Sequence, residues 1–351
     1  MNGAALEVRP LRAAEEGDYS AYLAAHEDAS VYHTLDWRDV LRTVYGYAPH
    51  YLVARDAGHI VGVLPLMMVA SPLSGRHLSA LPFSHRVALL ALPAAQPHLL
   101  AAAQQLTREC GGRYLELRED AGRLDVAGFA PAAGYWQSIL DLGPPVEALW
   151  RQVRSSTRRN VARAERAGVT VRRAQSADDH RRFYRLMLET RRHQGTPPYP
   201  RRLFDELARQ PWTRLYLADD AQGTTLAGLC IFVHGAQALY AYGASSKRAA
   251  HLEQRPNDLL FWRVIAELRA EQASALDFGI SPEHLGELRR FKENWGAVST
   301  LLHHARWSPT GAAPQGVARG GPLATCAARV IRHTPLPLLA WAGDRFFKYF
   351  G

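Results

Sequence analysis

Cysteine is scarce in this sequence: Cys110, Cys230 and Cys326 are the only three among 351 residues. They are odd in number, scattered and never spaced as C-x-x-C, which argues against a disulfide framework and a cysteine-based zinc site. No run reaches the roughly 18 apolar residues of a membrane span, and the first residues lack the basic and apolar regions of a signal peptide. These absences predict a cytoplasmic protein that neither spans a membrane nor is exported by a standard signal.

Motifs for metal binding and for hydrolytic triads are also missing. The 15 histidines include no H-E-x-x-H pair, and His303 and His304 lie in an apolar run that is typical of a strand. No serine, histidine and aspartate follow one another in the order of a known triad. We therefore expect neither a metal nor any other cofactor.

Acidic residues are outnumbered, with 33 Asp and Glu against 42 Lys and Arg and a net charge of +9. Such an excess favours an anionic partner, for example tRNA, a nucleotide-linked precursor or a lipid surface. A charge that serves solubility alone is the alternative.

The chain is long enough for two domains, and its pattern repeats. Residues 51–64 and 216–230 each predict a strand, a turn and a returning strand with a glycine just inside it. A strand, a helix and a strand are then predicted over 85–92, 96–109 and 114–117, and again over 238–244, 258–271 and 275–278. The same order twice predicts a duplicated α/β domain.

Residues 275–296, ALDFGISPEHLGELRRFKENWG, contain the clearest candidate for a site. A short strand is expected to end near Asp277, and a helix to begin with Ser281 as its cap and Pro282 in its first turn. Lys292 would sit one residue beyond an apolar stripe on that helix, formed by Leu285, Leu288 and Phe291. A fixed cation beside a strand-end carboxylate suits an anionic group. The alternative is a turn-capping aspartate and a solvated lysine.

Two further segments are distinctive. Residues 146–168 predict one basic helix, which either contacts phosphates or is a solvated linker; its arginines are Arg151, Arg154, Arg158, Arg159, Arg163 and Arg166. Residues 308–351 predict a flexible linker and then an amphipathic tail with Leu339, Phe346 and Phe350 on one face. The tail over 329–351 is expected either to lie on the inner membrane surface or to pack on the domains.

Two blocks together resemble the FemAB family: YAYGASSKRAAHLEQRPNDLLFW, and the run ending in RFKENWG. The resemblance is most specific over residues 149–307. It implies two tandem GNAT-like domains, over 1–145 and 169–307, and transfer of an aminoacyl group from aminoacyl-tRNA to an amine of an envelope precursor such as that of peptidoglycan. A broader branch is identified as GNAT or BioF2-like acetyltransferases.

The resemblance also implies roles for residues. Lys292 would engage the phosphate or carbonyl of the donor, Asp277 would orient Lys292 or help to move a proton, and Tyr242 would donate a hydrogen bond. Substrate contacts would come from Phe291, Arg290, Asn257, Arg192, Tyr199 and Trp37. For Asn257, capping of the helix that follows Pro256 is the alternative. The segment RRHQGTPPYP differs from the R-D-G-F motif of the peptidoglycan-type members, so the sequence leaves the identity of the acceptor substrate open.

Ordinary acetyltransferases of the GNAT class hold the coenzyme A pyrophosphate on a glycine-rich loop that opens a helix. Neither half of this sequence has such a loop, because the segment SSKRAAHLEQRPN is long, basic and free of glycine. Aminoacyl-tRNA is therefore the favoured donor. The alternatives are acyl transfer from coenzyme A to a sugar or lipid intermediate of the envelope, and a non-catalytic scaffold that binds RNA or an anionic membrane.

Overall fold

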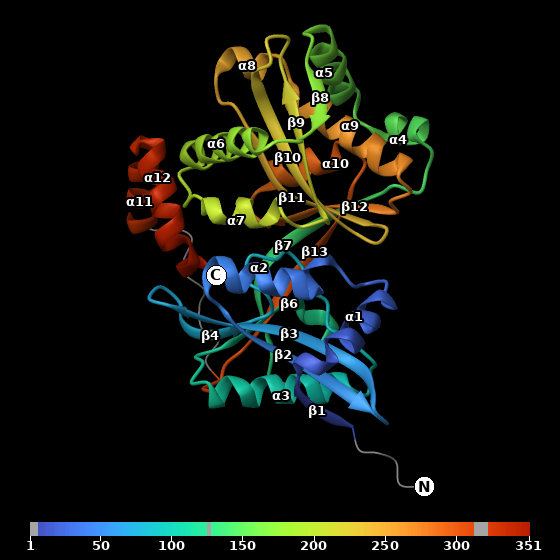
Figure 1. Cartoon of the computed structure of the whole chain (residues 1–351), viewed down its shortest axis with the longest axis vertical. Coiled ribbons are helices and arrows are strands. Elements are labelled where there is room, and N and C mark those ends of the chain that lie inside the picture. Colours follow the sequence, from blue (N-terminus) through green and yellow to red (C-terminus); the bar gives the residue numbers. More distant parts are fainter. Residues whose placement is uncertain (1–5, 125–127, 312–321) are drawn as a thin grey trace. The chain divides into compact units, whose positions relative to one another are not determined.

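The computed structural model describes residues 6–124, 128–311 and 322–351 (Figure 1). The chain forms two compact units. Unit 1 comprises Met1–Tyr135, Leu301–Ala318 and Lys348–Gly351, and unit 2 comprises Trp136–Thr300 and Arg319–Phe347. Each unit combines strands of mixed direction with flanking helices, and the predicted α/β class is confirmed.

Unit 1 has the strand order β1-β2-β3-β4-β6-β13, in which only β4 and β6 pair in parallel. Short 3-10 turns lie at Ala13–Glu15, Val31–His33 and Ala121–Arg123. The strands are β1 (Glu7–Pro10), β2 (Ala48–Asp56), β3 (His59–Ser71), β4 (Gly75–Ser79), β5 (Leu90–Ala91), β6 (Leu115–Asp120) and the end of β13 (Val298–Trp307), and the helices are α1 (Glu16–Ala24), α2 (Leu35–Tyr45) and α3 (Gln96–Glu109).

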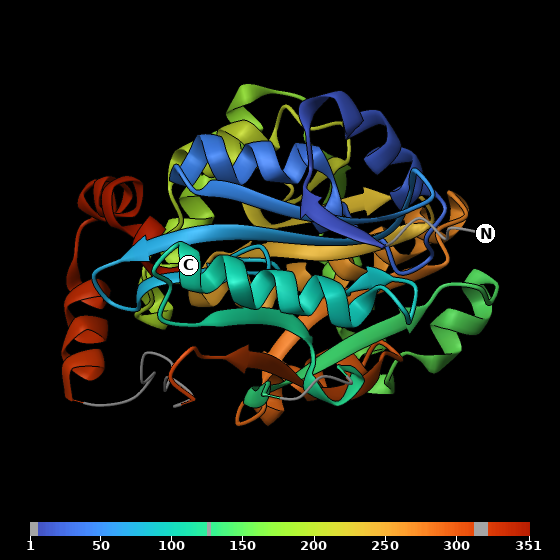
Figure 2. The same ribbon diagram turned by 90° about the horizontal axis from the view of Figure 1, so that it is seen from below.

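The helices of unit 1 follow the pattern of its sequence. Helix α2 begins at Thr34, whose hydroxyl accepts a hydrogen bond from the backbone of Trp37, and it ends at Gly46 in a left-handed conformation. Helix α3 packs so closely on β3 that a Cβ atom on Gly62 would lie 2.8 Å from Leu99. Figure 2 shows α2 and α3 on opposite sides of the β2–β3 hairpin. The unit is therefore a sheet covered on both faces.

The predicted strand over 85–92 is wrong. Only β5 forms there, antiparallel to β3, and the parallel partner of β6 is β4. Residues 80–89 form a loop instead, in which Leu81 and Phe83 have left-handed backbone angles. The loop is fixed by side chains, because the Trp37 indole donates to the Ser84 hydroxyl and Arg118 donates to the Ser84 carbonyl. Tertiary hydrogen bonds therefore replace the expected sheet pairing.

Unit 2 has the strand order β7-β12-β11-β10-β9-β8, with β11 and β12 parallel. Its strands are β7 (Ala130–Asp141, in unit 2 from Trp136), β8 (Thr170–Arg173), β9 (Thr213–Asp219), β10 (Thr225–His234), β11 (Gln237–Ser245) and β12 (Ala275–Pro282), and its helices are α4 (Val146–Gln152), α5 (Ser155–Arg166), α6 (Ala177–Gln194), α7 (Arg201–Leu207), α8 (Ala249–Glu253), α9 (Pro256–Ala270), α10 (Gly286–Glu293), α11 (Pro322–His333) and α12 (Leu336–Phe346).

Helices cover both faces of the unit 2 sheet. On one face, Leu229 and Ile231 of β10 join Val264 of α9 in a buried core. On the other, Gly228 lets α6 approach, since a Cβ atom there would lie 2.5 Å from the Phe183 ring. The strand and helix order β9-β10-β11-α9-β12 therefore repeats β2-β3-β4-α3-β6 of unit 1, which confirms the duplication.

The basic segment over 146–168 forms two helices rather than one. Val153 and Arg154 are extended between α4 and α5, and the Arg154 backbone N–H donates to the Asn294 carbonyl. Val153 is buried at this break, together with Leu149, Val161 and Ala164. Burying Val153 therefore interrupts a helix that local propensity would have continued.

The tail also forms two helices. Within unit 2, α12 packs on α6 and α7, with Leu339 buried and Gly343 against the carbonyls of Pro198 and Tyr199. Asp344 accepts a hydrogen bond from the Arg201 backbone at the start of α7. Phe346, on the predicted apolar face, is 45% exposed. Part of the predicted flexible linker, residues 312–321, lies outside the described residues.

Candidate functional site

A β-bulge in β11 shapes the centre of unit 2. Cys230 of β10 pairs with Tyr242, whereas Ile231 pairs with Tyr240, so Ala241 is an extra residue in β11. The parallel pairing of β11 with β12 covers only three residue pairs and ends at Leu239 and Asp277, just before the bulge. A bulge bends and twists its strand, which explains why the two strands cease to pair there. The backbone of β12 after Asp277 is left without β11 as a partner.

Lys292 occupies this region and is 1% exposed. Its Nζ donates to the Gly279 carbonyl oxygen at 2.7 Å, and the Gly279 N–H donates to Asp277 Oδ1 at 2.7 Å. Gly279 has φ +70°, a left-handed conformation that suits glycine. The backbone of Gly279 is therefore bonded by Asp277 at its N–H and by Lys292 at its carbonyl. The alternative of a solvated Lys292 is wrong.

Burial lowers the pKa of Lys292 to about 8, against the opposing attraction of the Asp277 carboxylate. No other charged group among the described residues shifts this lysine. An ammonium group has three N–H donors, and Gly279 accepts one of them. The remaining donors can bind an anionic oxygen of a substrate or the oxyanion of a tetrahedral intermediate.

The local structure around Lys292 differs from the sequence prediction. Strand β12 continues to Pro282, and α10 begins only at Gly286, so Ser281 does not cap a helix. Leu285 and Leu288 are exposed rather than packed. Phe291 and Trp295 anchor α10 instead, with ring centroids 5.3 and 5.7 Å from that of Phe261 in α9. This anchoring turns the neighbouring Lys292 toward β12.

Some polar groups near this lysine had no signal in the sequence. Gln137 of β7 donates from Nε2 to Asp277 Oδ2 at 2.7 Å, across 140 residues of chain. Ser281 Oγ and Trp295 Nε1 are buried without a hydrogen-bond partner among the described residues. Buried polar atoms normally have partners, so groups without one commonly mark a place where a ligand or water binds. Trp295 could have been suspected, since it belongs to the RFKENWG block.

The other predicted site residues fall into separate groups. Tyr242 and Tyr199 lie together, with ring centroids 5.1 Å apart. Arg191, rather than the predicted Arg192, stacks on Tyr199 at 4.6 Å and donates to the Pro197 carbonyl. Arg192 is half-buried on α6. Arg290 is exposed on α10, next to half-buried Phe291.

Asn257 and Trp37 lie outside both groups. Asn257 is the second residue of α9, and the helix is preceded by Arg255 in a left-handed conformation, so the capping alternative for Asn257 is wrong. Trp37 belongs to unit 1 and is 1% exposed, with its indole bonded to Ser84. The structure therefore joins Asp277 with Lys292, and Tyr199 with Tyr242.

Comparison with known proteins agrees with this architecture. Residues 151–293 match the family described as acetyltransferase (GNAT) domain. The whole fold is similar to the crystal structure of FemX, with a TM-score of 0.68 and 16% identity over 86% of this chain and 97% of that one. The chain has a FemAB-like tandem GNAT fold.

Two further structures share this tandem GNAT fold. One is the C-terminal domain of a putative lysylphosphatidylglycerol synthetase from Agrobacterium fabrum, with a TM-score of 0.56 and 15% identity over 91% of this chain and 96% of that one. The other is a tandem GNAT protein from the clavulanic acid biosynthesis pathway, with a TM-score of 0.53 and 15% identity over 89% of this chain and 100% of that one. No curated protein matches the sequence.

The GNAT acetyltransferase domain supports acyl transfer as the activity of this tandem GNAT protein. Within that domain lie β11, β12, α9 and α10, which together carry Asp277 and Lys292. Among the described residues, no helix is both long enough and apolar enough to cross a membrane.

Proposed function

We propose that this protein transfers an aminoacyl group from aminoacyl-tRNA to an amine of a cell-envelope precursor. The observation that carries the proposal is the start of α9, where a GNAT acetyltransferase binds the pyrophosphate of its donor. Ser246 to Arg255 fill this place with the short helix α8 and contain no glycine. A donor that lacks the pyrophosphate of coenzyme A therefore suits this helix start better than coenzyme A does.

The surface of α5 supports a nucleic-acid donor. Among the described residues, no ion pair is formed by Arg158, Arg159, Arg163 and Arg166 of α5 or by Arg151 near the end of α4, and most of these arginines are exposed. Arginines that no carboxylate neutralises are suited to phosphate, because the guanidinium group binds phosphate oxygens in pairs. The only acidic residue of α5, Glu165, is bound by Arg263 of α9. The helix can thus contact a tRNA backbone.

The site supports a simple reaction. The acceptor nitrogen attacks the ester carbonyl of the aminoacyl group, a C–N bond forms, the C–O bond to the ribose breaks, and the amine proton ends on the ribose oxygen. Lys292 stabilises the negative charge on the carbonyl oxygen of the ester, and Asp277 holds the N–H of Gly279, the residue whose own carbonyl is bonded to Lys292. Tyr242 and Tyr199 are proposed to line the substrate path.

The resemblance to the FemAB family suggests the substrate class. The similarity to a putative lysylphosphatidylglycerol synthetase suggests that a protein of this fold can transfer an aminoacyl group. The proposal places the reaction in the cytoplasm. Contact of the tail with the inner membrane surface is part of it, supported by Trp341 and Leu338, which are 62% and 57% exposed on α12.

A donor-consumption assay tests the proposal. The protein is incubated with mixed aminoacyl-tRNAs, with acyl-coenzyme A thioesters, and with each plus hydroxylamine as a small nucleophile. Donor loss is counted as the excess over a blank without protein, because hydroxylamine cleaves esters and thioesters unaided. We expect protein-dependent loss of the aminoacyl ester and no protein-dependent loss of thioester. Consumption of the thioester alone would replace the proposal by coenzyme A-dependent transfer, and consumption of neither would leave an RNA-binding or membrane-binding scaffold.

A further inference from the structure

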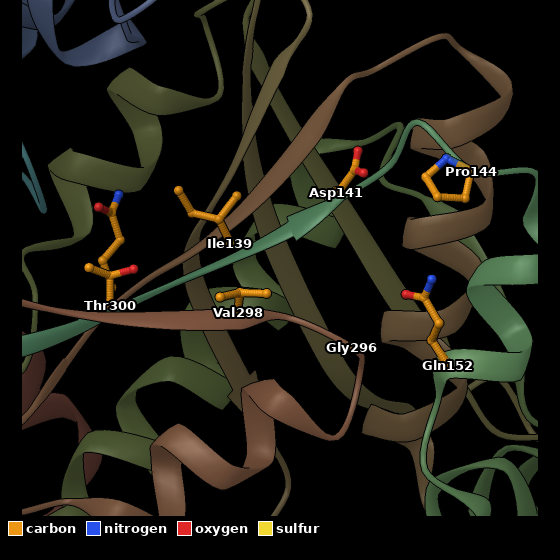
Figure 3. A pocket seen from close by; sticks show the side chains of 8 residues that line it. Ile139, Asp141, Pro144, Gln152, Gly296, Val298 and Thr300 are labelled. Atoms are coloured by element: carbon orange, nitrogen blue, oxygen red, sulfur yellow. The ribbon is translucent and has the colours of Figure 1, made fainter.

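An elongated cavity of about 410 Å³ lies in unit 2, between β7, β13 and the end of α4 (Figure 3). Three of its lining residues, Gln137, Ile139 and Asp141, alternate along β7 and therefore share one face of that strand. Val298 and Thr300 do the same on β13. The cavity is thus a trough along two neighbouring strands.

One end of the trough meets the candidate site. Gln137 is buried, and its amide nitrogen is bonded to the same Asp277 carboxylate that holds Gly279. Gly279 in turn accepts the hydrogen bond from Lys292. A substrate group at Gln137 is therefore connected to Lys292 through two residues.

The other end of the trough is anionic. Asp141 is the only charged side chain that lines the cavity among the described residues, and it is exposed. Its Oδ1 accepts a hydrogen bond from the Gly143 N–H at 2.8 Å, which fixes the carboxylate. Residues four apart on a strand are separated by about 13 Å, so Asp141 lies roughly that far along β7 from Gln137.

The middle of the trough is aliphatic. Figure 3 shows Ile139 and Val298 opposite each other, with Thr300 toward one end and Asp141, Pro144 and Gln152 toward the other. Ile139 is 40% and Val298 73% exposed, so the two side chains leave an apolar strip that is open to a ligand.

We propose that this trough binds the acceptor and that it selects a diamine-type chain; the inference rests on the proposed acyl transfer. The reacting amine lies at the Gln137 end, the alkyl segment lies over Ile139 and Val298, and a second ammonium group pairs with Asp141. Only the amine at the Gln137 end gains the acyl group, so its nitrogen is converted to an amide while the ribose oxygen of the donor leaves as a hydroxyl.

Two amines of equal length provide the test. Octamethylenediamine and octylamine differ only in the second amino group, and each is offered with the donor that the wild type consumes. An exposed ion pair is worth up to about fivefold, so we expect the diamine to have a roughly fivefold higher kcat/KM. Asp141→Asn should remove this preference. Asp56→Asn, an exposed aspartate of unit 1, should retain it.

A blocking variant tests the trough itself. Val298→Trp places a large ring on a highly exposed strand position, and we expect it to lower kcat/KM for both octyl amines at least about tenfold while hydroxylamine still accepts the acyl group. Thr170→Trp, at an exposed position of β8, is the matched control and should change neither. Transfer to octyl amines that is equal in all these variants would overturn the inference.

Direct binding separates this inference from the proposed function. Calorimetric titration of the wild type and Asp141→Asn with octamethylenediamine needs no donor. Asp141-dependent binding by a protein that acylates no amine, hydroxylamine included, would retain the trough as a diamine site and overturn the proposed function. If the protein transfers acyl groups but Asp141→Asn binds octamethylenediamine as tightly as the wild type does, the proposed function stands and the diamine inference is overturned.

Discussion

The two units share one order of elements but use buried charge differently. In unit 1, Glu116 accepts hydrogen bonds from Arg306, with an N–O distance of 2.8 Å, and lies 3.3 Å from Arg118. In unit 2, the buried cation Lys292 is bonded to a backbone carbonyl rather than to a carboxylate. A buried charge with close partners of opposite sign is typical of a structural network, whereas one that keeps unused donors is a candidate for binding.

The segment that follows β6 in unit 1 and β12 in unit 2 explains why the two units use buried charge differently. After β6, the described residues of unit 1 form a 3-10 turn at Ala121–Arg123, whereas after β12, unit 2 has the helix α10. This helix carries Lys292 and is anchored by Phe291 and Trp295 on Phe261. One duplicated framework thus supports a packed ion network in one unit and a reactive group in the other.

The largest effect is expected from Lys292→Met. Methionine keeps an unbranched side chain of similar length but removes the charge, so folding should persist. Loss of one preorganised donor typically lowers the rate by about 10²–10³-fold, which the donor-consumption assay measures. Lys348→Met is the matched control and should retain the rate. If Lys292→Met turns over normally, the lysine is structural and the contrast between the units disappears.

Glu116→Gln should act on stability instead. Burial opposes ionisation of Glu116, but Arg118 and Arg306 outweigh it and lower its pKa to about 2. Removing one partner of a buried ion pair typically costs about 3 kcal/mol, seen as a lower urea midpoint at neutral pH. Because the folded pKa lies below the ordinary 4.5, the wild type should lose this stability as the pH falls from about 4.5 to about 2. A variant as stable as the wild type at pH 7 would contradict the prediction.

Sequence patterns predicted the fold better than the site. The hairpins and α3 followed from apolar alternation and helical spacing, because those signals are local. The strand β4 was missed since GRHLS is short and polar. The apolar run over 85–92 forms only the short β5, because it follows Ser84, which Trp37 and Arg118 hold in a loop. Long-range hydrogen bonds of this kind leave no local pattern.

The candidate site was found only in part for the same reason. Lys292 and Asp277 stood out through the FemAB-like block, but the stripe of Leu285 and Leu288 suggested the wrong face of α10. Gln137 reaches Asp277 from a strand 140 residues earlier, and nothing near it in the sequence indicates this contact. The burial and the hydrogen-bond partners of a polar group depend on which strands are neighbours in the sheet. The spacing of residues along one helix or strand does not reveal those neighbours.

A smaller effect is expected in α12, which has no counterpart among the described residues of unit 1. Leu339 is 3% exposed, so Leu339→Ala should lower the free energy of unfolding by about 2–3 kcal/mol. Trp341→Ala, at a position 62% exposed, should leave stability nearly unchanged. Urea denaturation checks both variants.

The same two variants test the membrane interpretation of the tail. Binding to anionic vesicles that weakens with salt and with Trp341→Ala would support it. An intact protein that ignores vesicles, with a Leu339→Ala variant that unfolds early, would assign the tail to packing alone.

The smallest effect concerns pH, and here activity and stability should move in opposite directions. The folded pKa of Lys292, about 8, is below the ordinary 10.5. Between these values the unfolded chain binds the extra proton, so the contribution of Lys292 to stability increases as the pH rises. With hydroxylamine as the acceptor, whose nitrogen is already unprotonated in this range, the transfer rate should instead fall above pH 8 by about tenfold for each further pH unit, because the Lys292 ammonium group loses its proton.

Opposite slopes of this kind separate Lys292 from a general loss of structure at high pH, which would lower both quantities together. Lys292→Met has no ionisable group at this position, so its residual rate should lose the midpoint near 8, and its stability should lose the gain between about 8 and 10.5. The buried network of unit 1 cannot mimic this result, because Glu116 has a pKa of about 2 and stays ionised throughout that range. A rate midpoint near 8 that survives in Lys292→Met would assign the titration to another group, and Lys292 would then hold Gly279 without acting as the catalytic cation.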